Sequence, residues 1–280
     1  MNITPFSALA CPLDGATLTC TGSTWRCPAG HSFDVAGHGY TNLLPVHRKR
    51  SLDPGDSKAM VAARRRFLAA GHYQPIADAV ARALLAGLPA DASCLDAGCG
   101  EGYYLRRLAA AAGAGQSLAA LGLDISKWAV LAAAKQDKRP NWVVGSNANL
   151  PVLTGTLDRV LCLFGFPVHA EFARVLKAGG ELVRVDAGPG HLRELREIIY
   201  PRVKPEHTTE APTPAGFRHL GTEALGYSCA LAGAEQIADL LTMTPHLYRA
   251  NAEGRARAAA LSALTLTVDV RLARFAREAA

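Results

Sequence analysis

Apolar and polar positions follow two different rhythms along most of this chain. In residues 71–88, Ile76, Val80, Leu84 and Leu88 recur at four-residue steps, which predicts an amphipathic helix with one apolar face. Short apolar runs predict strands at residues 93–98, 118–124, 141–145, 158–164 and 181–186, with Ala-rich helical stretches between most of them. This alternation predicts an α/β fold around a mostly parallel sheet that is covered on both faces.

The two ends of the chain depart from this alternation. Residues 264–275 alternate apolar and polar side chains for part of their length, as an antiparallel strand with one solvated face does, and we expect residues 217–231 to pair with them. Residues 1–40 are rich in Gly, Cys and Thr and hold too few large apolar side chains for a core of their own. We therefore predict a small module at 1–40, a basic linker and helix at 41–70, and the main domain at 71–280.

Composition says less about the class of protein than the pattern of apolar and polar positions does. The chain has 280 residues, a formal net charge of +6 and a pI near 9.0, which suits a polyanionic partner but is also common among metabolic enzymes. We find no cationic signal segment and no apolar run near the roughly 20 residues of a membrane helix. Seven cysteines, an odd number, favour reduced thiols. We expect a cytoplasmic protein that does not associate with membranes.

The most informative stretch is CLDAGCGEGYY, residues 94–104. Gly98, Gly100 and Gly102 lie between a predicted strand and a predicted helix, where the backbone can approach a ligand at the helix N-terminus. Asp96 precedes this loop and Asp124 ends the next strand. An acid at the first position suits an ammonium group, and one at the second can accept hydrogen bonds from ribose hydroxyls. The two acids therefore predict a site for S-adenosylmethionine. The alternative is a tight strand–helix turn that binds no ligand.

Two polar residues extend this predicted site. Ser146 and Asn147 follow the third strand of the main domain. In a Rossmann-like sheet the adenine of a nucleoside lies at this carboxyl edge. They therefore complete a predicted adenosine pocket.

Several longer motifs resemble one family. GYTNLLPV, RKRSLDPGDS, GHYQP, the glycine loop, GPGHLREL and MTPHLYRA are similar to the 23S ribosomal RNA (guanine-N1)-methyltransferase A family, and the resemblance runs from Cys11 to about residue 250. It implies a zinc-ribbon-like module joined to a class I S-adenosylmethionine-dependent methyltransferase domain, usually as a homodimer. The implied reaction methylates N1 of one guanine in a hairpin of 23S rRNA.

The resemblance also implies ligands. The implied cofactor contacts are Tyr73, Gly100, Glu101 and His191, although Tyr73 could instead pack on its helix and His191 could cap one. In the family, zinc is held by C-x-x-C followed by C-x-x-x-H. This chain has Cys11, Cys27 and His31 in register, but Asp14 replaces the second cysteine. Three alternatives remain: Asp14 completes the site, the spare Cys20 does so, or the metal is lost.

Basic residues beside the module are candidate contacts to RNA phosphates. They fall in two runs, Arg48, Lys49 and Arg50, and Arg64, Arg65 and Arg66; a solvated surface is the alternative. Guanine N1 lies on the Watson–Crick edge, so a paired target must be unpaired or flipped out.

Phe164 and Phe166 follow the fourth strand and could stack on the target base, or belong to the core. Asp186, which ends the fifth strand, is the candidate general base. Two other functions stay open: methylation of the neighbouring guanine, which gives macrolide resistance, and a non-catalytic RNA-binding role in ribosome assembly.

Overall fold

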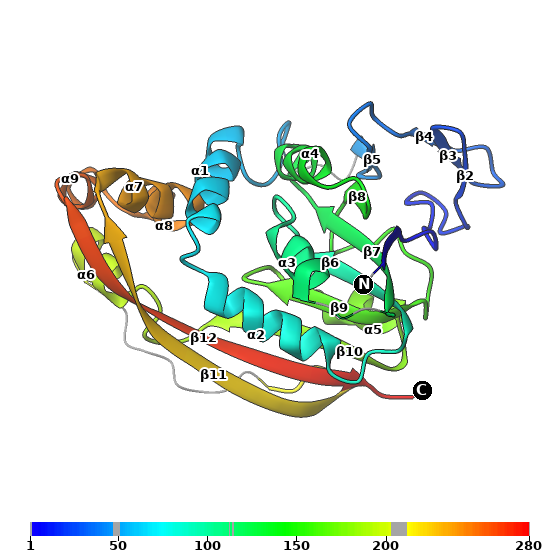
Figure 1. Ribbon diagram of the computed structural model, residues 1–280. Helices are drawn as coiled ribbons and strands as arrows, with labels where there is room; N and C mark the ends of the chain where they lie inside the picture. Colours follow the sequence, from blue (N-terminus) through cyan, green and yellow to red (C-terminus); the bar gives the residue numbers. More distant parts are fainter. Residues whose placement is uncertain (1, 47–50, 112, 114, 203–211, 280) are drawn as a thin grey trace.

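The structure is a computed structural model that describes residues 2–46, 51–111, 113, 115–202 and 212–279. Within these residues one nine-stranded sheet forms the centre of the molecule (Figure 1). In spatial order its strands are β11 (Phe217–Ala232), β12 (Ala263–Arg277), β10 (Leu176–Ala187), β9 (Leu157–Leu163), β6 (Asp91–Ala97), β7 (Ser117–Asp124), β8 (Asn141–Val144) and β5 (Tyr40–Asn42), with β1 (Asn2–Pro5) beside β7.

The strand directions confirm the predicted fold class. Strands β6 to β10 pair in parallel, as do β1 with β7 and β5 with β8. Only the end of the chain reverses: β12 runs antiparallel to β10, and β11 antiparallel to β12. These last two strands form the long curved hairpin along the lower edge of Figure 1. The fold is Rossmann-like, with the antiparallel C-terminal hairpin that the sequence predicts.

Helices connect the strands, and α2 crosses in front of β10 and β12 in Figure 1. No helix in the described part of the chain is long and apolar enough to cross a membrane. The helices are α1 (Lys58–Ala69), α2 (Gln74–Leu85), α3 (Tyr103–Ala111), α4 (Lys127–Gln136), α5 (His169–Val175), α6 (Arg193–Ile199), α7 (Ala234–Met243), α8 (His246–Arg249) and α9 (Ala252–Ala259).

Helix α2 shows how the apolar spacing becomes structure. Ile76, Val80 and Leu84 are each about 1% exposed and lie in the main apolar core. The helix begins three residues later than the periodicity predicts, because Gly71, at φ +84°, ends helix α1 in the left-handed conformation that glycine tolerates. This turn places Tyr73, the residue just before α2, in the interior.

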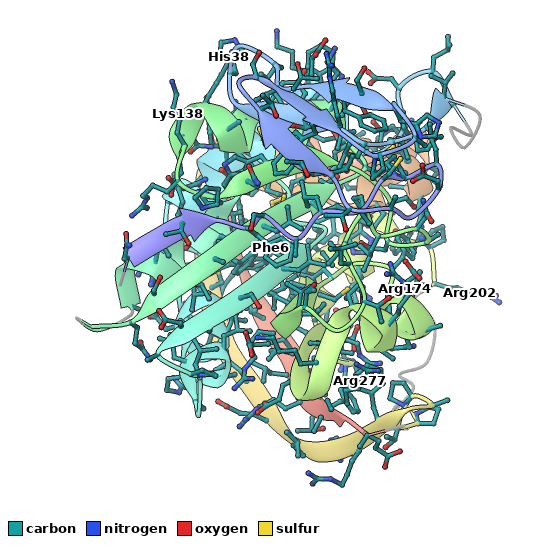
Figure 2. All side chains as sticks on the ribbon, turned by 90° about the vertical axis from the view of Figure 1, so that its right-hand side faces the viewer. Phe6, His38, Lys138, Arg174, Arg202 and Arg277 are labelled. Atoms are coloured by element: carbon teal, nitrogen blue, oxygen red, sulfur yellow. The ribbon has the colours of Figure 1, made fainter. Side chains whose placement is uncertain are left out.

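The N-terminal module is joined to the main sheet at both ends. Its own sheet is small and antiparallel, with strands β2 (Thr19–Thr21), β3 (Thr24–Arg26) and β4 (Ser32–Asp34). Strand β1 before it and β5 after it both belong to the large sheet. Figure 2 labels Phe6 where the chain leaves β1, and His38 in the N-terminal module above it. This module, residues 1–40, is called the ribbon below.

The ribbon also shares the apolar core of the main domain. Leu18 and Trp25 are buried in the same cluster as Leu121 and Val143 of the central strands. This agrees with the expectation that the module lacks a core of its own. The proposed boundary at residue 40 falls within the pairing of β5 with β8 and stays a prediction.

Candidate active site and candidate zinc centre

A cavity of about 760 Å³ opens at the carboxyl ends of the parallel strands. The segments that follow β6, β7, β8 and β9 line it, together with the end of β10. Helix α1, Tyr73 and the segment 243–246 line it as well. This is the edge at which open α/β sheets bind ligands, and the volume is within the range of small-molecule sites.

The three glycines of the 98–102 loop have different reasons to be glycine. All have positive φ, at +100° for Gly98, +55° for Gly100 and +79° for Gly102. Gly98 and Gly100 line the cavity. Gly102 does not, and a Cβ there would lie 2.5 Å from the ring of Trp142. Its small size is therefore explained by packing, and its predicted cofactor contact is not needed to account for it.

The two acids that bracket the loop are both buried, but only one is hydrogen-bonded. Asp124 accepts hydrogen bonds from the backbone N–H groups of Gly100 at 2.9 Å and Ser126 at 2.8 Å. Asp96 is 1% exposed, and neither of its carboxyl oxygens has a hydrogen-bond partner among the described residues. Burial, with the nearby charge of Asp124, raises the pKa of Asp96 to about 8. A buried acid without a donor fits an incoming cationic group.

Glu101 is also buried, and one oxygen of its carboxylate is already hydrogen-bonded. Arg106 and the Gln136 side-chain amide each donate to Oε2 at 2.7 Å. These contacts tie the loop to α3 and α4. Glu101 lines the cavity, and its carboxylate is held within this network.

Three aromatic side chains form one wall of the cavity. The ring of Phe164 stacks on His191 with centroids 5.6 Å apart, and Tyr73 lies 6.2 Å from each. Burial lowers the pKa of His191 to about 4, so the imidazole is neutral near pH 7. The backbone N–H of Asp269 donates to its Nδ1 at 3.3 Å. The proton is therefore on Nε2, which faces the Tyr73 hydroxyl at 3.4 Å.

Asn147 connects the loop that follows β8 with the loop that follows β9. Its Nδ2 donates to the carbonyl of Phe166 at 3.3 Å, while its buried Oδ1 has no partner in the part of the chain that the structure describes. Ser146 lines the cavity beside it. Phe166 is 90% exposed and Phe164 39%, so neither is a core residue, which settles one of the alternatives left by the sequence.

Asp186 faces the cavity from the end of β10. Arg184 donates through Nε to Asp186 Oδ2 at 2.6 Å. Arg184 is itself buried, with its guanidinium over the ring of Phe275. Asp186 Oδ1 has no partner among the described residues, so one oxygen is held and the other is free to accept.

Cys11, Cys27 and His31 of the ribbon meet in one cluster with Asp14. His31 Nδ1 lies 3.5 Å from Cys11 Sγ, 3.3 Å from Cys27 Sγ and 3.1 Å from Asp14 Oδ2. A tetrahedral zinc ion would separate sulfur from nitrogen by about 3.5 Å and nitrogen from oxygen by about 3.3 Å. Cys20 is exposed and its Sγ points to the carbonyl of Gly22. The geometry therefore favours Asp14 over Cys20.

Comparison with known proteins identifies the family. Residues 9–52 match the model described as "RlmA, N-terminal", and residues 94–180 match "Methyltransferase domain". The chain is 32% identical, over 95% of both chains, to a Bacillus subtilis (strain 168) protein named "Putative 23S rRNA (guanine-N(1)-)-methyltransferase YxjB". It is 36% identical to the Streptomyces fradiae 23S rRNA (guanine(748)-N(1))-methyltransferase, over 68% of this chain and 67% of that one. The chain belongs to the 23S rRNA (guanine-N1)-methyltransferase family.

This methyltransferase holds the three consecutive arginines of α1 in three different environments. Arg64 lines the cavity and forms an ion pair with Asp56. Arg66 forms a two-pronged ion pair with Asp239 of α7. Arg65 is exposed, with no hydrogen bond or ion pair to the described residues. RNA contact by all three stays a prediction, and Arg65 is the best placed of them; Arg48, Lys49 and Arg50 lie outside the described residues.

Sequence reasoning missed part of the methyltransferase cavity. Gly55, Asp56 and Arg64 line it, as does the segment 243–246. RKRSLDPGDS and MTPHLYRA mark these stretches as typical of the family, but no rhythm or spacing places them at the sheet edge. Their position depends on tertiary contacts.

Proposed function

We propose that this enzyme methylates N1 of one guanine in a hairpin of 23S rRNA, with S-adenosylmethionine as methyl donor. The observation that carries the proposal is a cavity lined by the acid Asp124 and by the exposed rings of Phe164 and Phe166, with the buried acid Asp96 two residues before the glycine loop that also lines it. The printed names of the relatives support the RNA substrate. The zinc-ribbon module, which is joined to the same sheet, is consistent with it.

The cofactor end is defined by donors and acceptors that fit the ligand. Asp96, buried without a partner, suits the amino group, and Asp124 suits the ribose hydroxyls. The free Oδ1 of Asn147 can accept from an exocyclic amine such as that of adenine, with Ser146 beside it. Tyr73, His191 and the backbone of Gly98, Gly100 and Glu101 complete the proposed contacts.

The target end must remove a proton. S-adenosylmethionine supplies a methyl group on a positively charged sulfur. N1 of neutral guanine carries a proton and has no free lone pair, so this proton must leave as the N1–carbon bond forms. We assign Asp186 Oδ1 as the acceptor of this proton, with Arg184 fixing the other oxygen. Phe164 and Phe166 are placed to stack on a flipped guanine.

Asp186→Asn is expected to lower kcat for RNA methylation about 10²- to 10³-fold, because the amide cannot take the proton. The dissociation constant for S-adenosylmethionine should change less than twofold, since the cofactor end is intact. Single-turnover methylation and calorimetric titration measure the two quantities. Asp78→Asn, which removes an exposed carboxylate of α2, is the control; equal rates for both variants would exclude Asp186 as the base.

We further propose that Cys11, Asp14, Cys27 and His31 hold one zinc ion, which maintains the ribbon in the shape that contacts RNA. Arg65 and the basic run Arg48, Lys49 and Arg50 would neutralise RNA phosphates. The family resemblance also supports a homodimer that acts on rRNA in the cytoplasm. Sedimentation of the zinc-loaded protein tests the dimer.

The reaction is tested by mapping the methylated nucleotide. The protein is incubated with tritiated S-adenosylmethionine and unmodified 23S rRNA, and the labelled position is identified. Label at N1 of one hairpin guanine is the expected result. Label at the neighbouring guanine would assign the enzyme to the macrolide-resistance branch. Cofactor binding without label on naked RNA or ribosomal particles would contradict the proposed substrate.

A further inference from the structure

The turn that precedes α1 lies directly on the loop that holds Asp124. Gly55, at φ +83°, lies so close to this loop that a Cβ would be 2.8 Å from Ile125 Cγ2 and 2.9 Å from Ser126 Cβ. The Ser126 hydroxyl donates to the carbonyl of Asp56 at 2.6 Å. Trp128 Nε1 donates to the carboxylate of Asp53 at 2.6 Å. The DPGDS turn is therefore fixed to the start of α4.

The same serine connects this turn to the cofactor acid. The backbone N–H of Ser126 donates to Asp124 Oδ1, and Asp124 Oδ2 accepts from the N–H of Gly100. Hydrogen bonds thus run without a break from Asp56 through Ser126 and Asp124 to the glycine loop. A displacement of the turn would therefore also displace Asp124, the proposed ribose acceptor.

Arg64 joins the turn to two further walls of the cavity. Its guanidinium forms an ion pair with Asp56 and donates through Nη2 to the carbonyl of Met243 at 3.1 Å. Its Nη1 also lies over Gly100, 3.6 Å from where a Cβ would be. One side chain therefore contacts the DPGDS turn, the glycine loop and the end of α7, and these three segments are far apart in the sequence.

We propose that Asp56 and Arg64 form a clasp that closes the cofactor cavity, with Arg64 acting as a positioning residue for S-adenosylmethionine rather than as an RNA contact. The clasp holds the cavity walls at the spacing that the adenosine needs, and the positive charge of Arg64 faces Asp124. Consistent with this, Arg64 lowers the pKa of Asp124 against the dominant effect of burial, which raises it. The inference rests on the proposed cofactor site.

Neighbouring arginines provide the test. We expect Arg64→Met to raise the dissociation constant for S-adenosylmethionine about tenfold in calorimetric titration without RNA, and Arg64→Lys to recover part of the loss. Arg65→Met, which removes the same charge one residue away, should stay within twofold of wild type. In RNA binding the order reverses: Arg65→Met should flatten the salt dependence, and Arg64→Met should leave it unchanged.

A second pair of variants distinguishes an effect on the clasp from a general loss of folding. Gly55→Ala introduces a clash at the clasp, whereas Gly39→Ala imposes a similar φ of +88° with no atom within 4 Å. Only the first should weaken cofactor binding. Equal cofactor affinity for Arg64→Met and wild type, or an altered RNA salt dependence for Arg64→Met, would overturn the clasp. Mapping of the methylated nucleotide is separate, so a wild type that binds cofactor but methylates another substrate would leave the clasp intact.

Discussion

Replacing Asp96 by alanine is expected to raise the dissociation constant for S-adenosylmethionine by about a hundredfold or more and to abolish measurable methylation. The side chain is fully buried, and within the described residues neither carboxyl oxygen has a hydrogen-bond partner. An ammonium group that enters beside it loses its water, so removal of the carboxylate leaves a buried charge unpaired, at a cost of about 2–5 kcal/mol. RNA affinity should change little, because Asp96 is remote from solvent. Calorimetry and RNA filter binding measure the two affinities.

The pH dependence of cofactor binding tests the same residue. Burial raises the pKa of Asp96 to about 8, so the free protein carries a proton there at pH 7. Only the carboxylate pairs with an ammonium group. Affinity should therefore rise by up to about tenfold per pH unit between pH 5.5 and 7, and binding should release close to one proton at pH 7. A flat profile in the wild type would contradict this assignment.

Asp96→Asn is the matched control, because it keeps the shape and removes the charge. A carboxyl group whose pKa is raised by folding destabilises the native state progressively as the pH rises from about 4 to 8. The amide has no such penalty. This variant should therefore gain stability relative to wild type as the pH rises from about 4 to 8, while it binds cofactor weakly and without pH dependence. Stability gained with affinity lost would distinguish a binding residue from a structural one.

Cys27→Ala is expected to lower zinc affinity about 10²- to 10³-fold, the share of one ligand in a four-ligand structural site. Cys20→Ala removes the same atoms from the same ribbon and should retain one zinc per chain. The reason is geometric: Cys27 Sγ lies 3.3 Å from His31 Nδ1 and 3.4 Å from Asp14 Oδ2, whereas Cys20 is outside the cluster. Competition with a chromophoric chelator measures both, and zinc loss in Cys20→Ala would overturn the ligand set.

Asp14 can be tested by restoring the ligand found in the family. Asp14→Cys should raise zinc affinity about tenfold or more, because a thiolate is a softer ligand for zinc than a carboxylate. Asp14→Ala should lower it. Unchanged affinity in both variants would mean that the ion has three protein ligands.

The sequence predicts most of the fold because the deciding patterns are local. The apolar steps of Ile76, Val80 and Leu84, the glycine loop and the alternating C-terminal strand each fix one element without reference to the rest. Strand β1 has no such pattern: it is four residues long, with one buried side chain. It becomes a strand because β7 offers it a partner along its first half.

The site is less predictable where long-range contacts decide a side chain's role. Arg64 and Arg65 are indistinguishable in a basic run, yet Arg64 turns to the carbonyl of Met243, 179 residues away in the sequence. Glu101 is similar: its position in the glycine loop predicts a ligand contact, but not the hydrogen bonds that Arg106 and Gln136 donate to its carboxylate. The candidate zinc residues are implied by the family resemblance rather than by a local pattern. They meet beside the small antiparallel sheet, in the segments that flank its strands.

The two-ended attachment of the ribbon has a consequence for substrate choice. Since β1 and β5 both pair with central strands, the module is held to the main sheet at both ends, and its cysteine and histidine cluster stays at a constant distance from the cavity. If RNA binds at the ribbon as proposed, this distance sets which nucleotide reaches the cavity. A helix shortened or lengthened by a few base pairs would then bring a different nucleotide there.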